Sequence, residues 1–485
     1  MFRLFEIIRS LARRYIPLKY RIKIVNSTFA ILNLPISLTT KATKLNVTHG
    51  DSVRRRIKKK VKQRLTRNSI RGPLNRLACI CLERLFSKKL NSLPLTPSIS
   101  YFPDQRKVLL VIGTLGGGGA ERQLVLLALQ LKVFGWEPVV VVKYLDGEEN
   151  RVLLPLLTES SVKVLNLYDF SYAGSLDQPK KFDMPIFDAA QRLVEIIKCE
   201  KPSVVHSWMD YANCETLIAG TFIHIPKVIL GLRSVSPDNF PLWSPTFRPT
   251  YQHLMKNKDT TLVCNSENGR KSYANWLGGA QIEVIPNGVV IEGNTGFLER
   301  NLMRHDEKQN VIGCLRLSWE KGPDLWIEVA RMVCERDANI YFHLFGVGPL
   351  RQEIEKTIRI NNLERRVVLH GFQKNPWILM NWDLHLSTSR IEGLPNVVIE
   401  ASLHGIPTAA FNVGGIPEIL GKDSDSLVKP FDIELMAEKV VSLLNSHERR
   451  LIEANRARNY VKNQLNLDLI TRRYVILYES KSVKN

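Results

Sequence analysis

The chain contains 485 residues, 44% of them apolar, which is enough for the cores of two or three domains. Its seven cysteines are odd in number and scattered, a pattern that fits a reducing cytosol better than a disulfide framework. No stretch reaches the ~18 uninterrupted apolar residues of a membrane-spanning helix, which argues against an integral membrane protein.

The net charge of +21 at pH 7 is concentrated near the N-terminus. Residues 1–100 contain 23 Lys or Arg and only 3 Asp or Glu, so the rest of the chain is close to neutral. As a helix, residues 1–20 would have one apolar and one arginine-rich face, and residues 54–67 form a second basic cluster. We therefore expect residues 1–90 to attach the protein peripherally to an anionic membrane surface, on its cytoplasmic face.

Other interpretations of this basic segment stay open. The first helix could pack on its own protein, or the segment could be a solvated tail, a transit peptide or a contact for RNA or another polyanion. Nucleic acid is not the partner that we expect. Charges recur at Arg3, Glu6, Arg9 and Arg13, so the segment lacks the uninterrupted apolar core of a secretory signal.

From Arg106 onward, short apolar runs alternate with helical patterns, which indicates parallel α/β units. The predicted strands are 107–112, 138–144, 203–206, 227–231, 261–264, 282–285, 310–317, 340–345, 366–370, 383–387, 407–411 and 426–429. The fold class is therefore α/β, with two Rossmann-like domains facing across a cleft. The predicted division is a basic helical extension and linker, an N-terminal domain, a C-terminal domain, and a last helix packing back on the N-terminal domain: 1–103, 104–290, 291–465 and 466–485.

A glycine-rich loop follows the first predicted strand. A dinucleotide fingerprint needs Gly at positions n, n+2 and n+5, but the sixth position is Glu121 or Arg122 in the two available frames. Gly117, Gly118 and Gly119 still allow backbone N–H groups at a helix start to approach an anion closely. The alternative is a tight strand–helix turn without a ligand.

Two cations follow the first strand of the second predicted domain. Arg316 stands at the end of this strand, and Lys321 lies in the loop before Gly322 and Pro323 begin a helix. Ligands of α/β sheets bind at this edge, where an arginine and a lysine can hold a diphosphate. Because surface Arg/Lys pairs are common, this signal is weak on its own.

Two carboxylates near a further predicted helix form the sharpest signal. Glu392 follows an apparent strand, Gly393 begins the helix, and Glu400 comes eight residues later, which predicts both acids on one helix face. The helix is otherwise apolar and should be largely buried, where unpaired acids would be costly. The pair could accept hydrogen bonds from the hydroxyls of a sugar and a ribose.

With these motifs in order, residues 106–465 resemble the GT-B glycosyltransferases of family 4, often called the glycosyl transferase group 1 type. The series is more specific than its parts, which are 118–122, 265–267, 285–288, 316–322, 345–349, 392–400 and 405–407. The basic N-terminal hundred residues lie outside the resemblance.

The resemblance implies retaining transfer of a sugar from a nucleotide diphosphate sugar, without a metal ion on an Asp-x-Asp motif and without a further cofactor. Arg316 and Lys321 would stabilise the departing diphosphate, and Glu392 would bind donor-sugar hydroxyls. The remaining donor-binding residues would be Gly117, Gly118, Gly119, Gly346, Gly393, Leu394 and Glu400, with Glu400 on the ribose. The leaving phosphate would accept the proton of the acceptor hydroxyl, so the protein would supply positioning and electrostatic stabilisation.

His206 is a further candidate catalytic residue, predicted at the end of a strand and facing the cleft. Relatives often carry a histidine in this region that contacts the sugar or acceptor, and many have a second histidine two positions further on, where this chain has Trp208. Asp210 is nearby. Which of the three positions matters stays open, as does a purely structural, hydrogen-bonded role for His206.

We thus expect a transferase of a hexose-type sugar to a lipid-linked or polysaccharide acceptor in cell-surface glycan synthesis. The alternatives are a nucleotide-sugar epimerase or hydrolase of the same fold, and a polyanion-binding protein with a degenerate α/β body. Products formed with and without acceptor distinguish the two enzymes. The complete set of Arg316, Lys321, Glu392 and Glu400 argues against the polyanion-binding protein.

Overall fold

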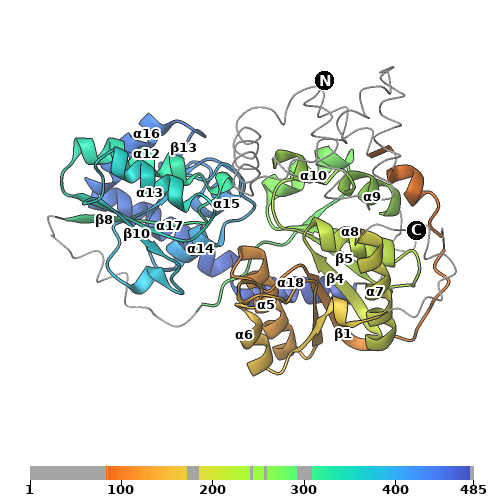
Figure 1. The fold of residues 1–485 in the computed structure, drawn as a ribbon. Helices are drawn as coiled ribbons and strands as arrows, with labels where there is room; N and C mark the ends of the chain where they lie inside the picture. The colour runs from red at the N-terminus through yellow and green to blue at the C-terminus, as the bar shows by residue number, and fades with distance from the viewer. Residues whose placement is uncertain are drawn as a thin grey trace, which may run out of the picture.

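The computed structural model describes residues 83–84, 86–94, 96–171, 185–240, 244–255, 259–291 and 308–480. Most of the basic extension, and with it the predicted membrane contact, lies outside the described residues. The rest folds into two α/β domains that stand side by side (Figure 1). The predicted fold class is therefore confirmed.

The N-terminal domain contains a seven-stranded sheet in the order β3-β2-β1-β4-β5-β6-β7, with every neighbouring pair parallel. The strands are β1 (Asp104–Ile112), β2 (Glu137–Val142), β3 (Lys163–Asn166), β4 (Pro202–Trp208), β5 (Val228–Leu232), β6 (Thr260–Cys264) and β7 (Glu283–Val284). The helices are α5 (Gly119–Val133), α6 (Leu154–Glu159), α7 (Pro185–Glu200), α8 (Asp210–Ala219), α9 (Phe247–Leu254) and α10 (Glu267–Leu277).

The C-terminal domain contains a six-stranded parallel sheet in the order β10-β9-β8-β11-β12-β13. The strands are β8 (Gln309–Cys314), β9 (Ile340–Phe345), β10 (Val367–Gly371), β11 (Leu384–Ser387), β12 (Thr408–Phe411) and β13 (Leu427–Val428). The helices are α12 (Pro323–Arg336), α13 (Arg351–Ile360), α14 (Asn396–Leu403), α15 (Ile416–Leu420), α16 (Ile433–Leu444) and α17 (His447–Gln464). Among the described residues, no helix is long and apolar enough to cross a membrane.

Both sheets are built from apolar runs that are buried on two faces, as parallel sheets require. In β1 and β2 the stretches 108–112 and 138–142 are completely buried. Each predicted strand is present, with its ends within three residues of the prediction. The structure adds β3, a short, half-exposed edge strand.

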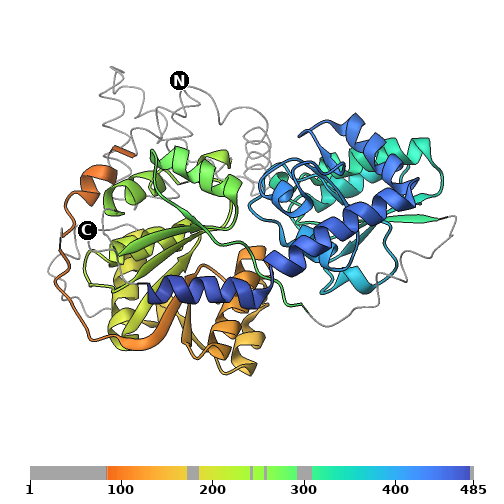
Figure 2. The ribbon, with the colours of Figure 1, turned by 180° about the vertical axis from the view of Figure 1, so that it is seen from behind.

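The last helix, α18 (Leu467–Glu479), returns to the N-terminal domain. Figure 2 shows it lying across that domain after α17 has crossed the C-terminal one. Its residues Ile470, Tyr474 and Tyr478 belong to the core between the first sheet and α5. Where the chain crosses between the domains, it runs beside residues 465–467, with Val289 N–H donating to Leu465 and Leu467 N–H donating to Val289.

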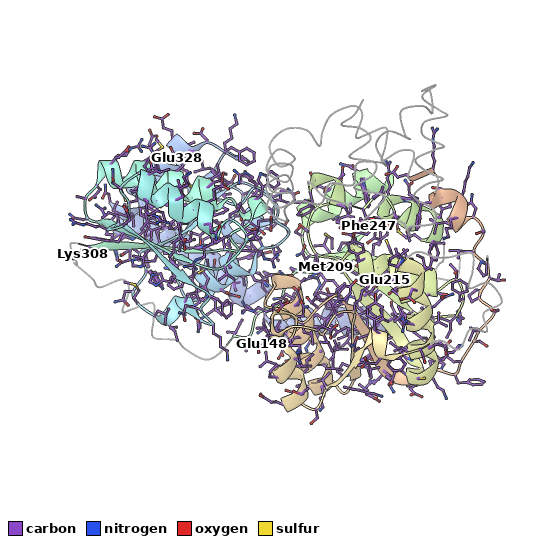
Figure 3. The ribbon with its side chains drawn as sticks, in the orientation of Figure 1. Glu148, Met209, Glu215, Phe247, Lys308 and Glu328 are labelled. Carbon is purple, nitrogen blue, oxygen red and sulfur yellow. The ribbon has the colours of Figure 1, made fainter. Side chains whose placement is uncertain are left out.

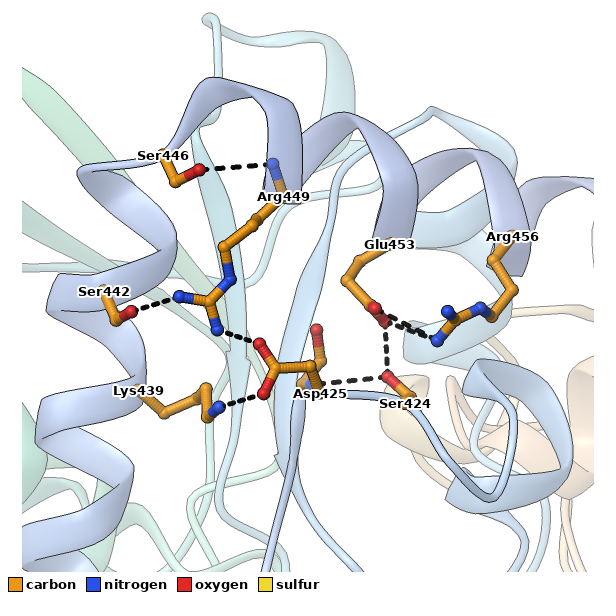
Figure 4. Close-up of polar contacts among 9 residues, drawn as sticks. Ser424, Asp425, Lys439, Ser442, Ser446, Arg449, Glu453 and Arg456 are labelled. Carbon is orange, nitrogen blue, oxygen red and sulfur yellow. Dashed lines mark hydrogen bonds and ion pairs between the residues drawn. The ribbon is translucent and has the colours of Figure 1, made fainter.

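Polar contacts fix the outer edge of the C-terminal sheet. The Asp425 carboxylate, just before β13, accepts from Lys439 of α16 and Arg449 of α17 (Figure 4). Arg449 also donates to Ser442 Oγ of α16 at 2.5 Å. Two helices and one strand end are thus tied together, on the side of the sheet opposite to the carboxyl ends of its strands.

Candidate active site

Lys321 and Glu392 meet in one ion pair. Lys321 ends a short 3-10 turn, η6 (Trp319–Lys321), and Glu392 follows β11. The Lys321 ammonium lies 2.7 Å from both carboxylate oxygens of Glu392, and Ser389 Oγ donates to one of them at 2.7 Å. Glu392 is only 5% exposed. The sequence identified both residues, but it did not predict that they pair.

Two glycines are required to build the loops around this pair. Gly322 has φ +63°, and a Cβ there would lie 2.2 Å from the carbonyl oxygen of Thr388. Gly346 has φ +138°, and a Cβ there would lie 1.9 Å from the carbonyl oxygen of Leu315. Only glycine fits both the conformation and the space. The loop that carries Arg316, whose side chain is exposed, is thus fixed against the loop after β9.

The prediction that both acids share one helix face is wrong. Helix α14 begins at Asn396, so Glu392 lies in the loop four residues before it. Pro395 precedes the helix in extended conformation, a position where its missing N–H costs no helical hydrogen bond. Leu394 is buried in the core beneath α14, so only its backbone is available to a ligand.

Glu400 faces the N-terminal domain. One carboxylate oxygen lies 2.8 Å from Arg122 Nη1, and the other accepts from the indole N–H of Trp377 at 3.0 Å. Arg122 belongs to the first turn of α5, directly after the glycine loop. Arg122 is included in the motif 118–122, but no role was predicted for it from the sequence.

The glycine loop lies against the start of α14. Asn396 Nδ2 donates to the carbonyl oxygen of Gly119 at 3.0 Å, and a Cβ on Gly119 would lie 3.2 Å from that nitrogen. Gly117 has open space around its Cβ position, with the nearest atom 4.0 Å away. Gly117–Gly119 thus stand at the domain interface, beside the helix that carries Glu400.

Asn287 joins the two domains at the same place. Its Nδ2 donates to the carbonyl oxygen of Leu394 and to Asn396 Oδ1, both at 2.7 Å, and its Oδ1 accepts from Arg233. In the sequence, residues 285–288 were identified only as one of the motifs of the resemblance. The 107-residue separation between Asn287 and Leu394 explains why no local pattern reveals the contact.

A second contact between the domains involves the start of α10. The carboxylate of Glu418 in α15 accepts from the backbone N–H groups of Glu267, at 3.0 Å, and Asn268, at 3.2 Å. A carboxylate at a helix N-terminus is favourable because it meets unpaired N–H groups and the positive end of the helix dipole. Burial raises the pKa of Glu418.

The predicted cleft-facing position of His206 is wrong. Strand β4 continues to Trp208, and His206 is completely buried, with Nδ1 2.7 Å from the hydroxyl of Tyr478 in α18. Even-numbered residues of β4 share the face that α18 covers. Burial, with a smaller effect of Arg233, holds the pKa of His206 well below its usual range.

We expect His206→Ala to lower the free energy of unfolding by about 2–3 kcal/mol, through a cavity and a lost hydrogen bond. Affinity of the folded protein for a nucleoside diphosphate should be unchanged. Urea unfolding and calorimetric titration on the same preparation check both parts. A selective loss of nucleotide affinity, with stability preserved, would contradict the position of His206.

Trp208 and Asp210 also have structural partners. The guanidinium of Arg233 lies 3.9 Å from the ring centroid of the buried Trp208. Asp210 begins α8 and accepts from the hydroxyls of Tyr251, at 2.9 Å, and Tyr273, at 3.0 Å. Met209, between them, has φ +74° and is exposed, on the side of the N-terminal domain that faces the C-terminal domain (Figure 3).

The Asp210 carboxyl makes the free energy of unfolding of the chain depend on pH. Burial raises its pKa from 3.8 to about 6, so the folded state binds this proton more tightly than the unfolded state does. Its contribution to stability is complete below pH 3.8 and is lost as the pH rises through about 6. Asp210→Asn does not titrate, so its stability relative to the native chain should rise by about 1–2 kcal/mol between pH 4 and pH 7. Urea unfolding across this range tests it, and a pH-independent difference would refute it.

No group of three or more His, Cys, Asp or Glu side chains within the described ranges could hold a metal ion. The candidate site consists of the buried Glu392 paired with the partly exposed Lys321, a second carboxylate held from the opposite domain, the exposed Arg316 and a glycine loop. This set can bind a polyanion through its cations and hydroxyl groups through its carboxylates.

Comparisons with known proteins agree with this geometry. Residues 117–292 match the family model described as glycosyltransferase family 4, and residues 298–463 match the model described as glycosyl transferases group 1. The two matches together include the glycine loop, both carboxylates and Lys321.

Two curated relatives and one solved structure are similar to the chain. The Vi polysaccharide biosynthesis protein VipC/TviE of Salmonella typhi is 25% identical over 72% of this chain and 69% of its own length. The poly(ribitol-phosphate) alpha-N-acetylglucosaminyltransferase of Staphylococcus aureus is 28% identical over 48% of this chain, and the match spans only 47% of that protein. HepE of Anabaena, solved in complex with UDP, has the same fold, with a TM-score of 0.62 at 20% identity over 76% of this chain and 99% of its own.

Proposed function

Because this chain belongs to the group 1, family 4 glycosyltransferases of the GT-B fold, we propose that it transfers a hexose-type sugar from a nucleotide diphosphate sugar to a glycan or lipid-linked acceptor, with retention of the anomeric configuration. The observation that carries the proposal is the ion pair of Lys321 and Glu392, in which the carboxylate is buried and the lysine side chain remains 30% exposed. A buried carboxylate held by a partly exposed ammonium is suited to positioning a charged, hydroxyl-rich substrate.

Arg316 and Lys321 are the residues that would bind the diphosphate of the donor. Arg316 is exposed and can present its planar guanidinium to phosphate oxygens. Lys321 has three N–H donors, so it can keep Glu392 in place and donate to a phosphate oxygen at the same time. Negative charge grows on the diphosphate as the bond to the sugar breaks, so both cations act most strongly in the transition state.

Glu392 and Glu400 would accept hydrogen bonds from hydroxyl groups of the donor. Glu392 would accept from hydroxyls of the donor sugar, with the backbone of Gly393 and Leu394 beside it, and Glu400 would accept from the ribose. The bond between the anomeric carbon and the phosphate oxygen breaks while the acceptor oxygen bonds to the same face of that carbon. The acceptor proton passes to the leaving phosphate oxygen, so no separate protein base is needed.

The relatives support the proposed donor and acceptor classes. One solved structure of this fold is of an enzyme in complex with UDP-glucose, and curated relatives transfer N-acetylglucosamine or galactose. Another relative takes part in polysaccharide biosynthesis. We therefore propose a UDP-hexose donor, a cell-surface glycan or its lipid-linked precursor as acceptor, no metal requirement, and a peripheral position on the cytoplasmic face of a membrane.

A product assay tests the proposal. The full chain is incubated with a panel of UDP- and GDP-sugars, with and without lipid-linked and oligosaccharide acceptors, in the presence of a chelator. Mass spectrometry should detect an acceptor heavier by one sugar residue. Free sugar or an isomerised nucleotide sugar, with no glycosylated acceptor, would instead support the hydrolase or epimerase.

A further inference from the structure

The contact between Arg122 and Glu400 joins the two domains at the residue that is proposed to bind the ribose. Arg122 Nη1 lies 2.8 Å from Glu400 Oε1, and their side chains are 44% and 18% exposed. Arg122 lies in α5 of the N-terminal domain, and Glu400 lies in α14 of the C-terminal domain. The two residues are far apart in sequence, so only the closely packed domains bring them together.

The neighbours of Arg122 fix its position. Glu121 turns back to the loop, where Thr114 Oγ1 donates to it at 3.1 Å. Gln123 exchanges two hydrogen bonds with the backbone of Gly288, at 2.8 and 2.9 Å. The first turn of α5 is thus held on both sides of Arg122. Gln123 Nε2 also donates to Asn396 Oδ1 of the C-terminal domain at 3.3 Å, and Arg122 reaches Glu400 from the same turn.

Both oxygens of Glu400 have one partner each. Arg122 holds Oε1, and the indole of the buried Trp377 donates to Oε2 at 3.0 Å. A carboxylate has about four lone-pair positions, so two partners orient the group and still leave acceptor capacity for two hydroxyls.

We propose that Arg122 is a positioning residue for the donor: it orients Glu400 toward the ribose hydroxyls from across the domain interface. The inference rests on the proposed function and deepens it. Ribose recognition then depends on the N-terminal domain as well as on the domain that holds the nucleotide. A donor that binds Glu400 would lie beside the glycine loop, because Arg122 is in the first turn of α5 and that turn directly follows the loop.

The test compares UDP with 2′,3′-dideoxy-UDP, which lacks both ribose hydroxyls, by calorimetric titration of the full chain. Arg122→Gln should weaken UDP binding about tenfold, whereas binding of the dideoxy analogue should change less than about twofold. Arg122→Lys should restore part of the difference, because it keeps the charge without the planar fork. The matched control is Arg331→Gln, which removes an arginine paired with Glu328 and Glu335 on its own helix, and it should change neither affinity.

The outcomes separate the two proposals. Equal weakening of both nucleotides in Arg122→Gln, or no weakening of either, would overturn the role of Arg122 while leaving the proposed function intact. If the native chain binds neither UDP nor GDP, both proposals are contradicted. Thermal unfolding of each variant shows whether the fold is preserved.

Discussion

Glu392→Gln is expected to lower kcat about 10²–10³-fold, because it removes a preorganised charge from the reacting centre. Glutamine keeps the shape of the side chain but replaces one carboxylate oxygen with an amide that donates. The ammonium of Lys321, now 2.7 Å from both oxygens, would face this neutral and partly repulsive group. The donor hydroxyls would lose an ionised acceptor at the same time.

Steady-state kinetics at saturating donor measure this loss, and UDP titration shows whether the nucleotide still binds. UDP affinity should change little, since Glu392 is proposed to contact the sugar and not the nucleotide. The matched control is Glu335→Gln, an exposed acid near the C-terminal end of α12, the end of that helix away from Lys321. A kcat within about threefold of the native value would show that Glu392 is not part of the reacting centre.

Glu215→Ala is expected to lower the free energy of unfolding by about 3–5 kcal/mol, because it leaves a buried ammonium without its partner. Glu215 of α8 forms an ion pair with Lys143, which follows β2, and the two side chains are 4% and 10% exposed. Figure 3 shows Glu215 within the N-terminal domain, on the helix that follows β4. Urea unfolding gives the value directly.

A double variant tests the physical reason. Lys143→Met with Glu215→Leu replaces both charges by apolar groups of similar size, which removes the desolvation cost as well as the attraction. We expect it to be more stable than Glu215→Ala alone. If the double variant is as unstable as the single one, the loss comes from packing and not from the unpaired charge.

Much of the fold could be predicted because it is encoded locally. Apolar runs such as 138–144 have the length and composition of buried parallel strands, and glycine or proline ends them. Strand β3 was missed because it lies at the sheet edge, where Lys163 and Asn166 interrupt the apolar pattern. A half-exposed strand carries less of the hydrophobic signal on which the prediction depends.

The candidate site could be predicted only in part, since residue types are local and contacts are not. Glu392, Glu400 and Lys321 were identifiable by chemistry and spacing, but the partner of Glu400 comes from the other domain. The predicted cleft-facing position of His206 was wrong for a related reason. Its partner Tyr478 is 272 residues away, and the sequence does not show that α18 covers this face of β4. Neither an interdomain contact nor the return of the last helix follows from a strand pattern.

The Lys321–Glu392 pair is proposed to serve retaining transfer from a nucleotide sugar. ¹H NMR of the reaction of the full chain with a UDP-hexose and an acceptor, run in parallel for the native chain and Lys321→Ala, tests this role directly. We expect a glycosylated acceptor with the anomeric configuration of the donor from the native chain, and a loss of at least about 10²-fold in rate from the variant. An inverted product, or an undiminished rate from Lys321→Ala, would contradict it.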